Sequence, residues 1–145
     1  MATIKTFEEL EIWKKAQELA VEIYLLAEKN EKVSRDFSFK DQIKRAVLSI
    51  SNNIAEGFEY SNNRDSIRFL RYSKGSAGEV KNCLLFAANV NFVAREKVQP
   101  LINSSNELGN RIGGLIRYLK NKVNNKSTTT ATLNPQPSTR NPITS

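Results

Sequence analysis

The sequence predicts an all-α protein, an up-down-up-down four-helix bundle followed by a disordered C-terminal tail. In four long segments the apolar residues recur at three- and four-residue steps, the spacing of amphipathic helices. No segment alternates polar and apolar residues for long enough to form a strand. From Asn124 onward the composition changes to Ser, Thr, Asn and Pro, which bury too little apolar surface to offset the entropy of ordering. We therefore predict a bundle over residues 1–123 and a tail over 124–145.

The first helix is predicted to open at Thr6, because Glu9 three residues later completes a capping box. One apolar face of this helix consists of Trp13, Ala16, Ala20, Ile23 and Ala27. A second apolar set repeats every seven residues on the flank of that face: Ile12, Leu19 and Leu26. A surface helix needs a stripe only about 100° wide. The wider stripe indicates either a helix packed between two neighbours of its own chain or a contact between subunits, in which case the flank set is the oligomer interface.

Three further helices follow. The polar segment Asn30 to Ser38 is predicted to be a loop, and the second helix to run from Phe39 to Tyr60. Gly57 near its end and the Ser-Asn-Asn cluster after it predict a connection and a new N-cap. The third helix is predicted over residues 64–89. The fourth begins near Glu96, because Pro100 is tolerated only in a first helical turn.

Composition excludes several classes of function. The 145 residues correspond to one domain, and no apolar run approaches the roughly 20 residues of a membrane-spanning helix. Cys83 is the only cysteine, so no intrachain disulfide forms and a reducing, cytoplasmic location is expected. The absence of histidine excludes His-based triads and His-ligated zinc. We find no catalytic constellation, and we expect a protein that is not an enzyme and needs no metal or cofactor.

The charge balance favours an anionic partner. The formal net charge is +7 and the sequence pI is near 9.6, which suits RNA or DNA contacted through the phosphate backbone. Arg64, Arg68 and Arg71 are spaced to share one side of the third helix, with Lys74 alongside. The complete set of candidate nucleic-acid-binding residues is Lys14, Lys15, Arg64, Arg68, Arg71, Lys74, Arg111, Arg117, Lys120 and Lys122. For any single cluster, the alternative is an ordinary solvated face.

A polar stripe borders the apolar face of the second helix. Its members, at helical spacing, are Gln42, Arg45, Ser49, Asn53 and Glu56. Polar groups beside a core must find hydrogen bonds or they destabilise the fold. We interpret the stripe as a structural hydrogen-bond network that fixes helix register. A contact with a ligand or with RNA is the alternative.

Two glycines interrupt the third helix. Gly75 and Gly78 each cost about 1 kcal/mol relative to alanine in a helix interior, so they call for a reason. A phosphate-binding loop is not indicated, because the strand-loop-helix context and the following Gly-Lys-Ser/Thr are missing. We interpret them as a site of close helix approach, which the glycines of the fourth helix could face.

Several segments together resemble a known family. The segments are Phe7-Glu8-Glu9-Leu10-Glu11-Ile12-Trp13, the Ser-Ile-x-x-Asn-Ile-Ala-Glu-Gly core of residues 49–57, Arg68-Phe69-Leu70, and Gly75-Ser76-x-x-Glu79. In this order and spacing they are similar to the four-helix bundle proteins named after intervening sequences of 23S rRNA. The match covers about residues 6–122, and residues 49–57 are its most specific part. The Ser-Thr-Pro tail and Pro100 depart from the family pattern.

The resemblance implies a partner and an assembly. It implies a homopentamer, and it places the chain near the accessory variability proteins of diversity-generating retroelements, which bind RNA or DNA and associate with a reverse transcriptase. We therefore carry two hypotheses, a nucleic-acid-binding adaptor and an oligomeric protein scaffold that serves a reverse transcriptase. An enzyme is the third, and activity lost on changing Glu56 or Glu79 would revive it.

Overall fold

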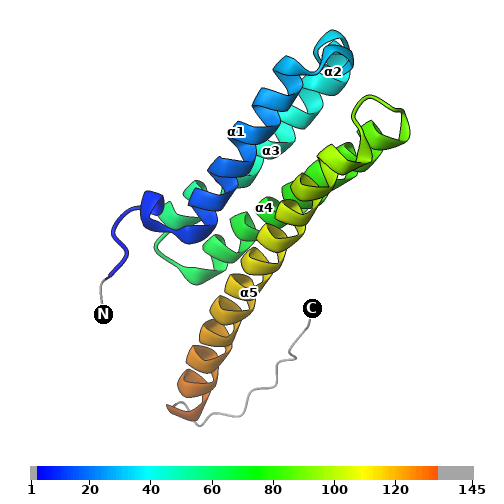
Figure 1. Ribbon diagram of the computed structural model, residues 1–145. Coiled ribbons are helices and arrows are strands. Elements are labelled where there is room, and N and C mark those ends of the chain that lie inside the picture. Colours follow the sequence, from blue (N-terminus) through cyan, green and yellow to red (C-terminus); the bar gives the residue numbers. More distant parts are fainter. Residues whose placement is uncertain (1–2, 134–145) are drawn as a thin grey trace.

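All the regular secondary structure in the described part of the chain is helical, as predicted. The computed structural model describes residues 3–133, and the side chains of residues 3–125. The elements in chain order are a 3-10 turn η1 (Phe7–Glu9) and the helices α1 (Glu11–Lys29), α2 (Glu31–Arg35), α3 (Phe37–Glu59), α4 (Asn63–Asn89) and α5 (Arg95–Leu133) (Figure 1). No strand occurs within residues 3–133.

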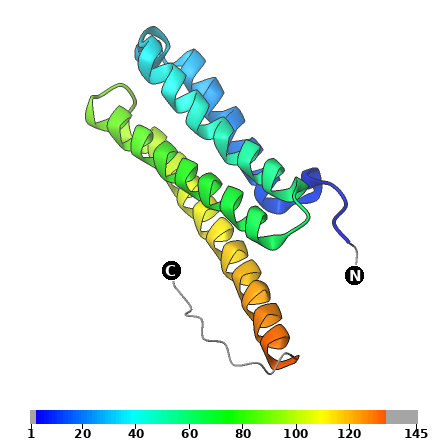
Figure 2. The same cartoon turned by 180° about the vertical axis from the view of Figure 1, so that it is seen from behind.

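Four long helices form an antiparallel bundle. The largest interfaces join α4 to α5 and α3 to α4, the next joins α1 to α3, and a smaller one joins α1 to α5. The helices therefore follow one another around the bundle in the order α1, α3, α4, α5, and the α1–α5 side is the more open. Figures 1 and 2 show that α5 projects well beyond the ends of the other helices.

One core fills the bundle. Its largest fully buried side chains come from all four long helices and from α2: Leu19, Ile23, Val33, Ile43, Val47, Ile50, Ile54, Val80, Leu84, Val98, Leu108 and Ile112. The apolar residues that recur at helical spacing in the sequence are thus the residues that form the core.

The capping box predicted for the first helix belongs instead to η1. The backbone N–H groups of Lys5 and Thr6 donate to the Glu9 carboxylate, at 3.0 and 2.9 Å, and these bonds lower the pKa of Glu9. Leu10 is extended, with φ −74° and ψ 129°, so the helical hydrogen bonding is interrupted there. Helix α1 therefore begins at Glu11 rather than near Thr6.

The predicted loop from Asn30 to Ser38 contains a short helix. The Asn30 side chain accepts a hydrogen bond from the Val33 backbone N–H at 2.9 Å, and Asp36 accepts one from the Phe39 N–H at 3.0 Å. These two side chains cap α2 and α3 in succession. Val33 is buried in the core, and its burial gives α2 the packing that a helix of one turn lacks alone.

The turn between α4 and α5 is set by its backbone. Asn91 adopts a left-handed conformation, with φ 61°, which asparagine tolerates better than most residues. The N–H groups of Asn91 and Phe92 donate to the carbonyls of Ala88 and Ala87, the two bonds of a Schellman motif. The Asn30 side chain then donates to the Phe92 carbonyl at 3.0 Å, joining this turn to the α1–α2 junction.

Helix α5 differs from its predicted bounds at both ends. It begins at Arg95, so Pro100 lies in the second turn rather than the first. Pro100 is exposed, so water can reach the carbonyl left without an intrahelical donor. At the other end the helix continues to Leu133, so residues 124–133 of the predicted disordered tail are helical. The remaining tail, residues 134–145, lies outside the described residues.

A seam of serine hydrogen bonds joins α3 to α4. The Ser66 and Ser73 hydroxyls donate to the Gly57 and Ile50 carbonyls, at 2.7 and 2.8 Å, and the Ser76 hydroxyl lies 2.9 Å from that of Ser49. Serine is small enough to bring the helices close, and each hydroxyl needs a partner because it is buried or half-buried. The seam therefore fixes the register of α3 against α4.

Helices α3 and α4 approach each other closely at Gly57, and we expect Gly57→Ala to destabilise the protein. A Cβ at this position would lie 3.3 Å from both the Phe69 Cβ and the Ser66 carbonyl oxygen, and neither atom can rotate away. We expect overpacking to outweigh the gain in helix propensity and to lower the free energy of unfolding by about 1–2 kcal/mol. Urea unfolding would measure it, and unchanged or higher stability would contradict this packing.

Candidate nucleic-acid interface

Three of the ten predicted nucleic-acid-binding residues already have carboxylate partners. Lys14 pairs with Glu11 at 3.8 Å, Arg68 with Asp65 at 3.5 Å and Arg111 with Glu107 at 3.0 Å. All three pairs are solvent-exposed and lie within one helix, so each contributes little to stability. Each carboxylate also offsets the charge that a phosphate would meet.

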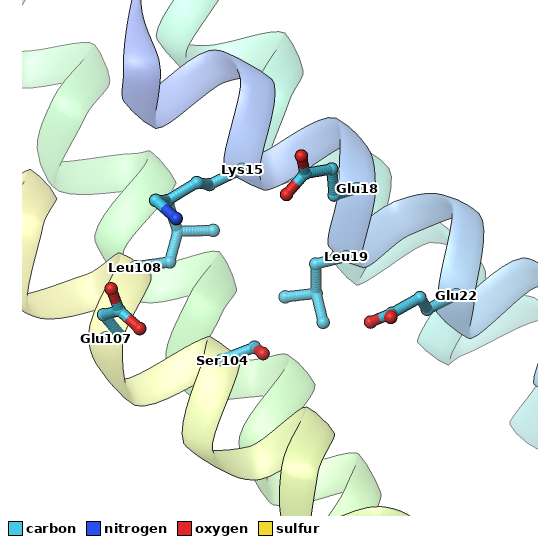
Figure 3. A pocket seen from close by; sticks show the side chains of 7 residues that line it. All are labelled: Lys15, Glu18, Leu19, Glu22, Ser104, Glu107 and Leu108. Carbon is cyan, nitrogen blue, oxygen red and sulfur yellow. The ribbon is translucent and has the colours of Figure 1, made fainter.

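Lys15 lies in an acidic groove. It lines a pocket between α1 and α5 together with three carboxylates, those of Glu18, Glu22 and Glu107 (Figure 3). The pocket floor is formed by Leu19 and Leu108. An anion entering this groove would meet more negative than positive charge. The structure thus separates Lys15, on α1, from the predicted basic residues of α4.

Five of the six remaining predicted cations lie on α4 and α5, where these two helices meet. A Cβ at Gly109 would lie 3.9 Å from the Ala77 Cβ, and one at Gly113 would lie 3.1 Å from the Lys74 Cε. These two contacts fix an antiparallel register, in which Arg117 and Lys120 of α5 lie level with the stretch of α4 that carries the arginines. We call this set the α4–α5 basic face: Arg64, Arg71, Lys74, Arg117 and Lys120.

Two cations, Lys74 and Arg117, converge at the Gly113 end of the face. The Lys74 stem crosses Gly113, and an Arg117 guanidinium nitrogen would lie 3.6 Å from a Cβ at the same glycine. Gly113 therefore provides the space in which side chains from two helices come together. Like charges repel, so this arrangement favours an anion between them.

The cations of the α4–α5 basic face are not paired with carboxylates of the described chain. Among the described residues, none of its five cations has a carboxylate oxygen within 4.0 Å. Glu79, one turn after Gly75, limits the face at one end. This contrasts with the groove between α1 and α5, where Lys15 shares the lining with three carboxylates.

The two glycines of α4 lie on the surface, and the predicted helix contact at them is wrong. Apart from the adjacent residues and the nearby backbone of α4 itself, no heavy atom would lie within 4 Å of a Cβ at Gly75 or at Gly78. With Arg64, Arg68 and Arg71 they form one helical stripe, at intervals of four and three residues. Beside the arginines, no side chain covers the α4 backbone at these two glycines. An extended ligand can therefore approach the backbone closely there.

Lys122 lies apart from this face. Its Nζ is 4.9 Å from the ring centroid of Tyr118, four residues earlier on α5. Helical spacing places it on a different side of α5 from Arg117 and Lys120. Of the predicted residues, the structure thus brings together five and leaves Lys14, Lys15, Arg68, Arg111 and Lys122 beside or away from them.

The predicted polar stripe of α3 divides in two. The Asn53 side chain donates to the Ser49 carbonyl and hydroxyl at 2.9 and 3.0 Å, and Ser49 meets Ser76 of α4. Gln42, Arg45 and Glu56 are exposed, and Arg45 pairs with Asp41 at 2.8 Å. Of the stripe, only Ser49 makes a hydrogen bond between helices, to Ser76 of α4, a partner that sequence reasoning missed; the bonds of Asn53 stay within α3.

The predicted oligomer interface is used within the chain. Ile12 and Leu19 are buried in the bundle core, and Leu26 is partly buried against it. The wide apolar stripe of α1 is explained by packing against both α3 and α5. Two other α1 residues remain in solvent, Val21 at 56% and Leu25 at 49% exposure. Their spacing of four residues places them on one side of the helix, a signal that the sequence analysis did not single out.

Few groups are placed for chemistry. Cys83 is buried, and burial first and Glu79 second raise the pKa of its thiol, which disfavours the nucleophilic thiolate. Within residues 3–125, no three potential ligands are close enough together to hold a metal ion. None of the helices described is long and apolar enough to cross a membrane.

The fold and the α4–α5 basic face define a small helical bundle with a surface suited to polyanions. Residues 8–114 match the family described as 23S rRNA-intervening sequence protein, and the chain belongs to that family. The resemblance predicted from residues 49–57 is thereby confirmed.

A solved structure shares the fold. It is the crystal structure of a protein of unknown function from the S23 ribosomal protein family of Bacteroides thetaiotaomicron. The two chains superpose with a TM-score of 0.66 at 26% identity, over 72% of this chain and 97% of that one. No curated protein matches the sequence at a significant level.

Proposed function

We propose that the protein is a non-enzymatic nucleic-acid-binding bundle that holds the phosphate backbone of RNA or DNA on its α4–α5 basic face. The observation that carries the proposal is the convergence of Lys74 and Arg117 over Gly113, in a set of five cations without a carboxylate partner. Cations arranged in this way bind phosphates and release counterions.

The exposed glycines add independent support. Gly75 and Gly78 each reduce helix stability by about 1 kcal/mol and gain no packing in return. A ligand backbone that approaches α4 closely gives them a function. The family name, which refers to 23S rRNA, favours RNA over other polyanions.

The test is direct binding at low salt. We expect fluorescence anisotropy to detect binding of a labelled structured RNA, weak sequence preference, and a steep loss of affinity as salt rises, because contacts to phosphate carry no sequence information. Absence of binding to RNA and to DNA at low ionic strength would refute the proposal.

A second candidate is an oligomeric protein scaffold, which the resemblance implies as a homopentamer and as an accessory subunit of a reverse transcriptase. Its specific support is the exposed pair Val21 and Leu25, beside an open groove lined by Leu26, Pro100 and Leu101. Exposed apolar residues next to a groove are typical of protein contacts.

Multi-angle light scattering tests the second candidate. We expect an assembly larger than the 16.4 kDa chain, and we expect Val21→Glu with Leu25→Glu to shift it toward the monomer while preserving the helical circular dichroism signal. A wild-type monomer at micromolar concentration would contradict it. The two candidates are compatible, because the exposed apolar pair lies on α1, whereas the cations of the basic face belong to α4 and α5.

A further inference from the structure

An aromatic cluster lies beside the arginines of α4. The rings of Tyr60 and Phe69 are stacked, with centroids 5.1 Å apart and planes at 15°. Tyr72 meets Phe69 edge-on at 5.8 Å, and the Arg68 guanidinium carbon lies 4.6 Å from the Phe69 centroid. We call these four residues the aromatic platform.

The platform is open to solvent. Tyr60 is 43% exposed and Tyr72 52%, although Phe69 between them is half-buried against Gly57 of α3. Aromatic rings of this size normally bury most of their area when they serve packing alone. The inner ring thus anchors the cluster, and the two tyrosines present surface that nothing in the described chain covers.

The platform adjoins the helical stripe of α4 that carries Arg64, Arg68 and Arg71. Arg68 belongs to both, since it lies four residues from Arg64 and from Tyr72, on the same side of the helix. Arginine is a cation at every physiological pH, and the Arg68 guanidinium lies over the Phe69 ring of the platform. An extended polyanion lying along the arginines would bring its neighbouring groups to the tyrosines.

We propose that the aromatic platform stacks unpaired bases, and that the preferred ligand of the α4–α5 basic face is therefore single-stranded nucleic acid or a single-stranded part of a folded RNA. This inference rests on the proposed function. Phosphates on the face and bases on flanking aromatic rings are the two elements by which proteins bind single strands. Bases in a duplex are stacked on one another and cannot reach the rings.

The experiment compares a single strand with a duplex of the same length and sequence. We expect Tyr60→Ala with Tyr72→Ala to reduce affinity for the single strand about tenfold or more, the usual loss for removing stacking on aromatic side chains. Affinity for the duplex should stay within about twofold. Tyr72→Phe, which retains the ring, should bind the single strand like the wild type.

Tyr118→Ala is the matched control. Tyr118 is 54% exposed and also lies beside a cation, but on α5 and away from the platform, so its loss should leave both affinities unchanged. Circular dichroism and light scattering would accompany each variant.

The outcomes separate the two proposals. Wild type that binds neither strand form refutes the proposed function itself. Equal binding of both forms, unaffected by the tyrosine variants but lost on changing Arg71 and Lys74, preserves that function and overturns the platform. A change of assembly size in the tyrosine variants, with unchanged single-strand affinity, would assign the platform to a protein contact and also overturn it.

Discussion

Reversing three cations of the α4–α5 basic face should abolish binding. We expect the triple variant Arg71→Glu, Lys74→Glu and Arg117→Glu to lose at least about 100-fold in affinity for RNA, because charge-assisted hydrogen bonds contribute about 1.5–3 kcal/mol each. All three side chains are exposed, so the helical content should be retained. Anisotropy titration at fixed low salt measures the change.

The control is a second triple variant that changes the net charge by the same amount. Arg35→Glu, Arg45→Glu and Arg111→Glu reverse cations that pair within their own helices, at 2.8, 2.8 and 3.0 Å. Each reversal changes the charge by two, so both triples reduce the formal net charge from +7 to +1. If the two triples weaken binding equally, net charge alone attracts the ligand and the face has no special role.

Replacing Gly75 and Gly78 of α4 with alanine should raise the stability of the protein and lower its affinity for RNA. For Gly75→Ala with Gly78→Ala we expect a gain of about 2 kcal/mol in the free energy of unfolding, since alanine is the better helix former by about 0.8–1.0 kcal/mol per site. No neighbouring atom lies within 4 Å of either new Cβ, so no steric cost offsets the gain. Larger residues, such as leucine at Gly78, should weaken RNA binding further by holding the phosphates away from the helix.

Urea unfolding and anisotropy titration together measure this variant. A substitution that stabilises a protein but impairs its function marks a position where stability is given up for function. A loss of stability would show that the glycines contact another element. A gain of stability with unchanged affinity would show that the ligand does not approach α4 at this stripe.

Much of the fold could be predicted from the sequence. Helical spacing of residues such as Ile43, Val47, Ile50 and Ile54 predicts which side of a helix is buried, and these four are buried. Short-range rules were less reliable. The capping box of Thr6 and Glu9 caps a 3-10 turn instead of the first long helix, because Leu10 is extended. The polar segment after Asn30 contains a short helix instead of a loop, because Val33 is buried in the core.

The candidate site was predicted only in part. Helical spacing grouped Arg64, Arg71 and Lys74 on α4, but their alignment with Arg117 depends on the register of two helices, which spacing within one helix does not contain. The glycines illustrate the same limit. A glycine in a helix signals a close approach, but the sequence cannot tell whether the approaching group is another helix or a ligand.

The salt dependence of RNA binding tests the central claim most directly. Plotted as the logarithm of affinity against the logarithm of salt concentration, wild-type data should fall with a slope of about −4, as expected for four or five neutralised phosphates. Arg71→Gln and Lys74→Gln should each reduce the slope by about one. A shallow slope, or one that these two substitutions leave unchanged, would contradict phosphate binding at the α4–α5 basic face.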